Sequence, residues 1–234
     1  MLNPALDPPA LARDFAARRR LQIHDILNAD AAAAVYECLA RDVPWNFTYL
    51  LDGQEHLLSP QELSAMSREQ HVQVGQSILE QARSRFAFGF MSFQMVDSYR
   101  RLTHPDLYLS RLLEALASPQ FIGFAREVAG DAAINRVDAQ ATRYTAGHFL
   151  TLHDDAHYEG VERRCAYVLN FSRGWRAEWG GTLQFLNGEG DVVETFVPHF
   201  NSMSLFAVPT PHIVSYVAPY ATQPRLSITG WFTV

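Results

Sequence analysis

Two histidines and an aspartate in the C-terminal half of the chain have the types and the order of ligands to a catalytic metal ion. His153 and Asp155 lie in the run Leu-Thr-Leu-His-Asp-Asp, and His212 follows 57 residues after Asp155. Two imidazoles and one carboxylate leave one face of a metal ion open, which is the ligand set of non-heme Fe(II) oxygenases. On an extended segment, side chains two apart share a face, so His153 and Asp155 can reach one ion together.

A basic residue follows these three at the start of a strand-like segment. Arg225 lies 13 residues after His212 and opens the run Arg-Leu-Ser-Ile-Thr-Gly-Trp-Phe. By strand alternation, Arg225 and Ser227 share one face and Leu226 takes the other. Because a guanidinium offers paired donors to a carboxylate, Arg225 suits the distal carboxylate of 2-oxoglutarate, and Ser227 could add a hydroxyl. The pattern predicts a site for Fe(II), dioxygen and 2-oxoglutarate as co-substrate.

The residues that must position this site read as β structure. Short runs rich in Val, Tyr, Phe, Thr and Leu, separated by Gly, Asn and Pro turns, occur at 134–145, 165–171, 181–186, 191–197, 203–207, 213–218 and 225–233. Regularly spaced short strands are typical of a sandwich, barrel or jelly roll. We expect a polar inner face toward a cavity and an apolar outer face against helices.

The first part of the chain, up to about residue 130, reads mainly as helix. We expect short strands at 21–27 and 45–50, a helix capped by Asn28 or Asp30, and one long helix beginning at Pro60. Two further helices are predicted at 107–116 and 119–128, with Gly130 as the stop. We therefore predict one domain over 1–234, in which 1–130 is mostly helical support that covers one outer face of a jelly-roll core at 131–234.

Composition excludes several classes of protein. The 234 residues carry a net charge of −6, and Arg18-Arg19-Arg20 is the only basic cluster, so direct nucleic-acid binding is not expected. No stretch approaches the ~18 apolar residues of a membrane span, and the first residues lack the features of a secretory signal. Cys38 and Cys165 do not form a disulfide framework. These features favour a cytoplasmic protein, and they leave its oligomeric state open.

The ordered motifs resemble the prolyl-4-hydroxylase-like branch of the 2-oxoglutarate/Fe(II) dioxygenases. The resemblance covers about residues 134–234 and is carried by Arg-Tyr-Thr-Ala-Gly-His-Phe-Leu-Thr-Leu-His-Asp-Asp (143–155), Tyr-Val-Leu-Asn (167–170), Trp-Gly-Gly-Thr-Leu (179–183), Pro-His-Phe-Asn-Ser-Met-Ser-Leu-Phe (198–206), His212-Ile-Val and the run from Arg225. It is greatest to the Tpa1-like group, which acts on a ribosomal or translation-factor proline.

The resemblance implies a double-stranded β-helix with His153, Asp155 and His212 as iron ligands and Arg225 as the 2-oxoglutarate anchor. It also implies that Tyr144 reaches the co-substrate, that ascorbate rescues oxidised iron, and that a protein or peptide proline is the substrate.

The sequence departs from the family pattern at two places. The gap from His212 to Arg225 is a few residues longer than in the shortest family members, which predicts a longer hairpin. Some prolyl hydroxylases have a co-substrate tyrosine directly before the Leu-Asn pair, where this chain has Val168. Tyr167 then faces away by alternation, and this raises the importance of Tyr144.

Other conspicuous residues admit ordinary roles. The alternating aromatic run that begins at Phe86 suits a core strand or a substrate-facing lid. Trp175 and Trp179 could rim the pocket or form a structural turn. His148, His157 and His199 lack suitable partners and are not expected to bind the metal.

Three alternatives to prolyl hydroxylation remain open at this stage. One is hydroxylation of a small molecule such as a free amino acid, which a deep closed pocket would favour. Another is a non-catalytic metal-binding jelly-roll module. The third is a cupin-type metal enzyme without an oxo acid, which would have no need of Arg225.

Overall fold

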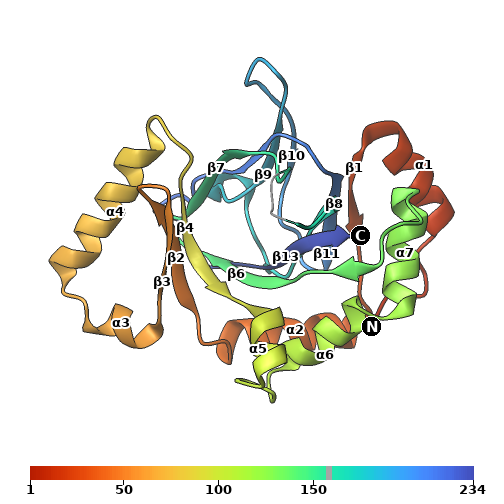
Figure 1. Ribbon diagram of the computed structural model, residues 1–234, viewed down its shortest axis with the longest axis horizontal. Helices are drawn as coiled ribbons and strands as arrows, with labels where there is room; N and C mark the ends of the chain where they lie inside the picture. Colours follow the sequence, from red (N-terminus) through yellow and green to blue (C-terminus); the bar gives the residue numbers. More distant parts are fainter. Residues whose placement is uncertain (157–159) are drawn as a thin grey trace.

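A computed structural model describes residues 1–156 and 160–234, and a nearly closed antiparallel β-barrel dominates these residues (Figure 1). Within them, the strand order is β1-β11-β8-β13-β6-β4-β7-β12-β9-β10, with β2 and β3 extending from β4 and β5 pairing with β13. The strands from the C-terminal part are β5 (Arg136–Val137), β6 (Gln140–Tyr144), β7 (Phe149–His153), β8 (Arg163–Asn170), β9 (Leu183–Leu186), β10 (Val192–Phe196), β11 (Ser202–Ala207), β12 (His212–Val214) and β13 (Arg225–Thr233). This is the predicted jelly roll.

Four strands from the N-terminal part complete the sheet. They are β1 (Arg20–His24), β2 (Asn46–Leu51), β3 (Gln54–Leu58) and β4 (Phe88–Phe93). β1 pairs with β11 at one edge, and β4 lies between β6 and β7, where it joins the two layers of the barrel. The strands expected at 21–27 and 45–50 are therefore present as β1 and β2, and the N-terminal part contributes strands to the sheet as well as helices.

Local signals explain where the helices begin and end. The helices are α1 (Pro8–Arg18), α2 (Ala29–Arg41), α3 (Pro60–Ala65), α4 (Arg68–Ala82), α5 (Met95–Arg101), α6 (Tyr108–Leu116), α7 (Pro119–Ala129) and the 3₁₀ turn η1 (Ala177–Trp179). The Asn28 side chain caps α2, and Gly130 ends α7 in the left-handed conformation, as expected. The single long helix expected from Pro60 is wrong, because Ser67 and Gln70 form a capping box that begins a second helix.

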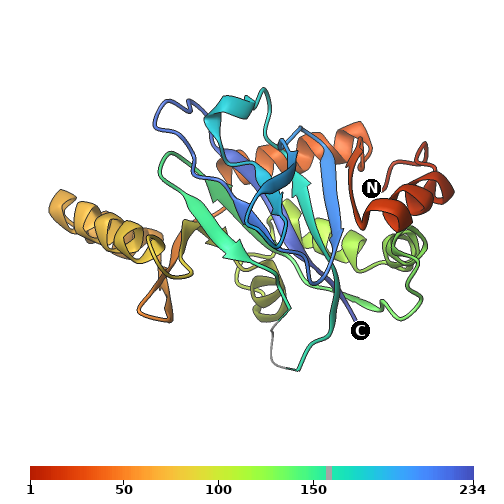
Figure 2. The ribbon, with the colours of Figure 1, turned by 90° about the horizontal axis from the view of Figure 1, so that it is seen from above.

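The helices form two groups. α2, α5 and α6 lie against one face of the sheet, and α1 packs with α7 beside them (Figures 1 and 2). α3 and α4 pack instead on the β2–β3 hairpin, and α4 projects away from the barrel (Figure 2). The expectation that the N-terminal helices cover one outer face is therefore correct only for the first group.

The main hydrophobic core lies between the first helix group and the outer face of the sheet. It joins Val35 and Leu112 of the helices to Leu169, Leu226 and Ile228 of the strands. Side chains that alternate with these strand residues point into the barrel, and this alternation produces the cavity described below. No helix in the described residues is long and apolar enough to cross a membrane.

Candidate metal centre

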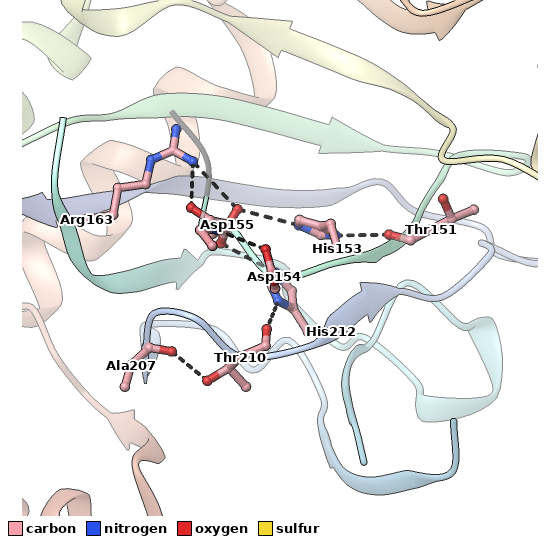
Figure 3. A network of polar contacts seen from close by, with 9 residues as sticks. Thr151, His153, Asp154, Asp155, Arg163, Ala207, Thr210 and His212 are labelled. Atoms are coloured by element: carbon pink, nitrogen blue, oxygen red, sulfur yellow. Dashed lines mark hydrogen bonds and ion pairs between the residues drawn. The ribbon is translucent and has the colours of Figure 1, made fainter. Parts of the chain in front are cut away.

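Adjacent strand ends bring His153, Asp155 and His212 together, as Figure 3 shows. His153 is the last residue of β7, His212 is the first of β12, and the two are paired in antiparallel register. The two carboxylate oxygens of Asp155 lie 3.7 Å from Nε2 of His153 and 3.7 Å from Nε2 of His212. One ligand atom from each of the three residues lies within 4.8 Å of the others, so the group could hold a metal ion.

Backbone carbonyls orient both imidazoles. Nδ1 of His153 donates to the Thr151 carbonyl at 2.9 Å, and Nδ1 of His212 donates to the Thr210 carbonyl at 2.8 Å. A donated Nδ1 proton leaves Nε2 as the electron-pair donor, which is the second-shell arrangement of metal-binding histidines. Burial, and then the nearby His153, lower the pKa of His212 to about 4, so this ring is neutral near pH 7.

Asp155 does not continue the extended strand, contrary to the alternation argument. Its φ of 65° lies in the left-handed region, which non-glycine residues adopt at a cost of about 1 kcal/mol or more. This turn in the chain directs the carboxylate back toward both imidazoles. Arg163 reaches the same residue, because its Nη1 donates to the Asp155 carbonyl at 3.3 Å and lies 3.9 Å from Oδ1.

The three residues line a cavity of about 920 Å³ inside the barrel. The inner faces of β6 and β13 contribute Tyr144 and Arg225 to its lining, and Phe88 and Phe90 come from β4. Large side chains at the opening are partly in solvent, with Phe86 43 % and Leu152 51 % exposed. The aromatic run from Phe86 is therefore a wall of the cavity, and its alternation is that of a strand.

Arg225 is a buried residue of the cavity lining, and two of its nitrogen atoms have no hydrogen-bond partner among the described residues. Its side chain is only 2 % exposed, and Nε and Nη1 have no hydrogen-bond partner among the described residues. Burial lowers the pKa of the guanidinium from its ordinary value. A buried cation without a partner is costly, so the residue fits a site for an anionic ligand such as a carboxylate.

Tyr144 is the neighbour of this guanidinium. The two residues are paired across β6 and β13, and the guanidinium carbon of Arg225 lies 5.0 Å from the centre of the Tyr144 ring. The ring stacks on Phe90 at 4.9 Å, and burial raises the pKa of its phenol. Tyr144 therefore lies beside Arg225 in the lining of the cavity, and its contact with the co-substrate stays a prediction.

Ser227 lies on the predicted inner face but is covered. Its hydroxyl is 2.8 Å from the hydroxyl of Thr142, and Thr142 rather than Ser227 lines the cavity. In this arrangement Ser227 forms a hydrogen bond with Thr142 and orients its side chain in the cavity lining. A direct contact between Ser227 and the co-substrate stays a prediction.

Sequence reasoning missed Arg163 in the cavity lining, whereas strand alternation had placed Trp231 on the inner face together with Arg225. The guanidinium carbon of Arg163 lies 3.5 Å from the centre of the Trp231 ring, and both residues line the cavity. Nε1 of Trp231 is buried and has no hydrogen-bond partner in the part of the chain that the structure describes. Trp231 shares the face of Arg225 by alternation, so its orientation was predictable, whereas its contact with Arg163 joins segments 68 residues apart.

The remaining candidates lie outside the metal group. Trp175 and Trp179 are buried against Tyr144 in a hydrophobic cluster beside the cavity. His148 and His199 are not part of the three-residue group. His157 lies outside the described residues.

Comparisons with known proteins agree with this geometry. Residues 139–233 match the sequence model of the 2OG-Fe(II) oxygenase superfamily. No curated protein matches the chain. A prolyl-4-hydroxylase from Pseudomonas putida superposes with a TM-score of 0.60 at 18 % identity, covering 97 % of this chain and 98 % of that chain.

Two further structures share the fold at low identity. A Trichoplax adhaerens prolyl hydroxylase, in complex with a hypoxia inducible factor oxygen degradation domain peptide fragment, gives a TM-score of 0.63 at 16 % identity and covers 97 % of this chain and 88 % of that chain. An oxidoreductase of the 2OG-Fe(II) oxygenase family from Burkholderia pseudomallei gives 0.62 at 13 %, with coverage of 100 % and 93 %.

The matched segment 139–233 contains the three clustered residues and Arg225. Its match to the family, the barrel fold and the two-histidine, one-carboxylate group agree with one another. Residues 139–233 therefore match the 2OG-Fe(II) oxygenase superfamily in sequence, and this match, together with the metal group, supports a dioxygenase.

Proposed function

We propose that this dioxygenase hydroxylates a prolyl residue of a protein, in the ribosomal or translation machinery as in the Tpa1-like group. The observation that carries the co-substrate requirement is the buried guanidinium of Arg225, whose Nε and Nη1 lack partners among the described residues. The sequence likeness and the prolyl hydroxylase folds support the prolyl substrate.

In this proposal the chain's own residues hold each reactant. His153, Asp155 and His212 bind Fe(II), because one ligand atom of each already lies within 4.8 Å of the other two. Arg225 binds the distal carboxylate of 2-oxoglutarate, and Tyr144 lies beside it. When bound, Fe(II) and 2-oxoglutarate supply the oxidative chemistry, in which dioxygen and 2-oxoglutarate yield succinate, carbon dioxide and a hydroxylated substrate.

The apolar surroundings limit water near the anchor. Phe90, Tyr144, Trp175, Trp179 and Val217 form one hydrophobic cluster on this side of the cavity. In a dry environment the interaction between the guanidinium and a carboxylate is stronger than in water. The same cluster fixes the Tyr144 ring, because an aromatic stack on Phe90 leaves it little rotational freedom.

The cavity also offers a contact for the substrate. Nε1 of Trp231 is a buried donor without a partner among the described residues, and Trp231 lines the cavity on the same strand face as Arg225. A peptide carbonyl would satisfy this donor. The half-exposed Phe86 and Leu152 at the opening favour a substrate that extends into solvent, as a polypeptide does, over a fully enclosed small molecule.

Mass spectrometry of cellular proteins tests the substrate. Cells that express the wild-type chain should carry a +16 Da modification on a specific proline, and cells that express His153→Ala should lack it. The purified enzyme, supplied with Fe(II), ascorbate and a peptide containing that proline, should form hydroxyproline and succinate in equal amounts. If succinate forms with a free amino acid and no protein proline is modified, the small-molecule alternative is correct.

A further inference from the structure

A second cavity lies on the opposite side of the sheet from the metal centre. It has a volume of about 410 Å³ and lies between α2 and the outer face at the start of β13. Its lining includes Tyr36, Leu39, Ala40, Arg143, Arg173 and Pro224. Two arginines line it, and among the described residues no carboxylate does.

Arg143 contributes an unsatisfied donor. Leu226 is its partner across β6 and β13, and both side chains point away from the barrel, because their neighbours Tyr144 and Arg225 point inward. Nε of Arg143 is buried without a hydrogen-bond partner among the residues described. None of the ion pairs among the described residues includes Arg143, although the protein as a whole is acidic.

Arg173 is held by two aromatic rings. Its guanidinium carbon lies 4.6 Å from the centre of the Tyr36 ring and 4.6 Å from the centre of the Phe200 ring. Tyr36 and Phe200 themselves meet edge to face at 6.1 Å. Stacking uses the flat faces of a guanidinium and leaves its N–H edge available for hydrogen bonds. The two rings therefore restrain an exposed arginine that takes part in none of the ion pairs among the described residues.

We propose that this cavity binds a small ligand through an oxyanion, either a phosphate ester or a carboxylate. Two guanidinium groups in one concave site attract a negative charge and offer several donors in a planar arrangement. A cation would be repelled, and a wholly apolar ligand would leave the Arg143 donor unsatisfied. Leu39, Ala40 and Pro224 provide an apolar wall for the rest of the ligand, and the volume is within the range of small-molecule sites.

Protection from chemical modification tests the site in the full-length wild-type chain. Phenylglyoxal modifies arginines, and peptide mass spectrometry gives the rate at each position. Inorganic phosphate, added at constant ionic strength with sodium chloride as reference, should slow modification of Arg143 and Arg173 at least about fivefold. It should not affect Arg68, the first residue of the remote helix α4, or Arg83, which directly follows this helix. If phosphate slowed modification equally at all four positions, or did not slow it at Arg143 and Arg173, the proposal would be overturned.

A pair of double variants tests anion binding at this cavity independently of the chemical modification. The midpoint temperature of thermal unfolding of the wild type should rise with the concentration of inorganic phosphate or of acetate, until the site is saturated. Sodium chloride at the same ionic strength is the reference. The variant Arg143→Gln/Arg173→Gln should lose this response, with at least about tenfold weaker binding, whereas Arg68→Gln/Arg83→Gln should keep it. The tighter of the two probes identifies the ligand as a phosphate ester or a carboxylate. An unchanged response in the first variant would refute the site.

Because the readouts are protection and binding, they do not depend on the proposed prolyl hydroxylation. Loss of hydroxylation with intact protection would count against the proposed function alone. Normal hydroxylation with no protection would count against the second site alone.

Discussion

Replacement of Arg225 by methionine is expected to raise the free energy of unfolding of the metal-free protein and to weaken its binding of 2-oxoglutarate. The side chain is 2 % exposed, and Nε and Nη1 lack partners within the described residues, so the free protein carries a poorly compensated buried charge. Methionine has a similar length and no charge. Exchanging buried ions for apolar side chains stabilises proteins by about 1–4 kcal/mol. Loss of the cation–π contact with Tyr144 offsets part of this gain, which leaves about 1–2 kcal/mol.

The affinity for 2-oxoglutarate should fall in the same variant. A hydrogen bond to a charged group contributes about 1.5–3 kcal/mol, so the loss corresponds to roughly 10- to 150-fold weaker binding. Urea denaturation of the metal-free protein measures the first effect. Calorimetric titration of 2-oxoglutarate into the Mn(II)-loaded protein measures the second, since Mn(II) does not turn over. Arg68→Met, on the surface of α4, is the matched control and should change stability by less than about 0.5 kcal/mol.

Two results would refute this reasoning. Unchanged affinity for 2-oxoglutarate would show that Arg225 is not the anchor. A less stable metal-free variant would show that the buried guanidinium is compensated in the free protein, so that its isolation does not indicate an anionic ligand.

Three further predictions concern the metal, the backbone and pH. His153→Ala removes one of three ligands and should abolish Mn(II) binding in calorimetry; retained tight binding would exclude the proposed centre. Gly180→Ala should lower the free energy of unfolding by about 2–4 kcal/mol, because φ is 69° and the new Cβ would lie 2.0 Å from the Tyr216 carbonyl oxygen, whereas Gly188→Ala meets no atom within 4 Å and should be neutral. Burial lowers the pKa of His148 from 6.5 to about 4, so the unfolded chain takes up the proton first as pH falls. Stability should therefore be constant above about pH 7 and fall by up to about 3 kcal/mol toward pH 4, as urea denaturation would measure. His148→Gln should reduce this loss, and an equal loss in both proteins would contradict the assignment.

The C-terminal half could be predicted well because its signals are local and ordered. The types and order of His153, Asp155 and His212 predicted the metal group. Strand alternation predicted that Arg225 faces the cavity. The conformation of Asp155 could not be predicted in this way. A positive φ at an aspartate depends on how β7 ends against β12, which is a tertiary property.

The N-terminal half was harder to predict because its strands are completed by distant partners. The aromatic alternation from Phe86 suited a strand at β4, which pairs with the distant β6 and β7, but no local pattern predicted β3, which pairs with β2. The break between α3 and α4 had a readable signal, since Ser67 and Gln70 have the spacing of a capping box. The stacking of Arg163 on Trp231 joins segments far apart in the chain, and no local pattern predicts it.

The alternation of β13 has a consequence for how this protein can tolerate insertions and deletions. Arg225 and Leu226 face the metal cavity and the helix layer respectively, and a shift of one position would exchange them and bury the cation in the apolar core. The connection between His212 and Arg225 is not bound by this alternation. Related proteins can therefore differ in its length without exchanging the faces of Arg225 and Leu226. Changes in length inside the strand itself would be acceptable only in pairs.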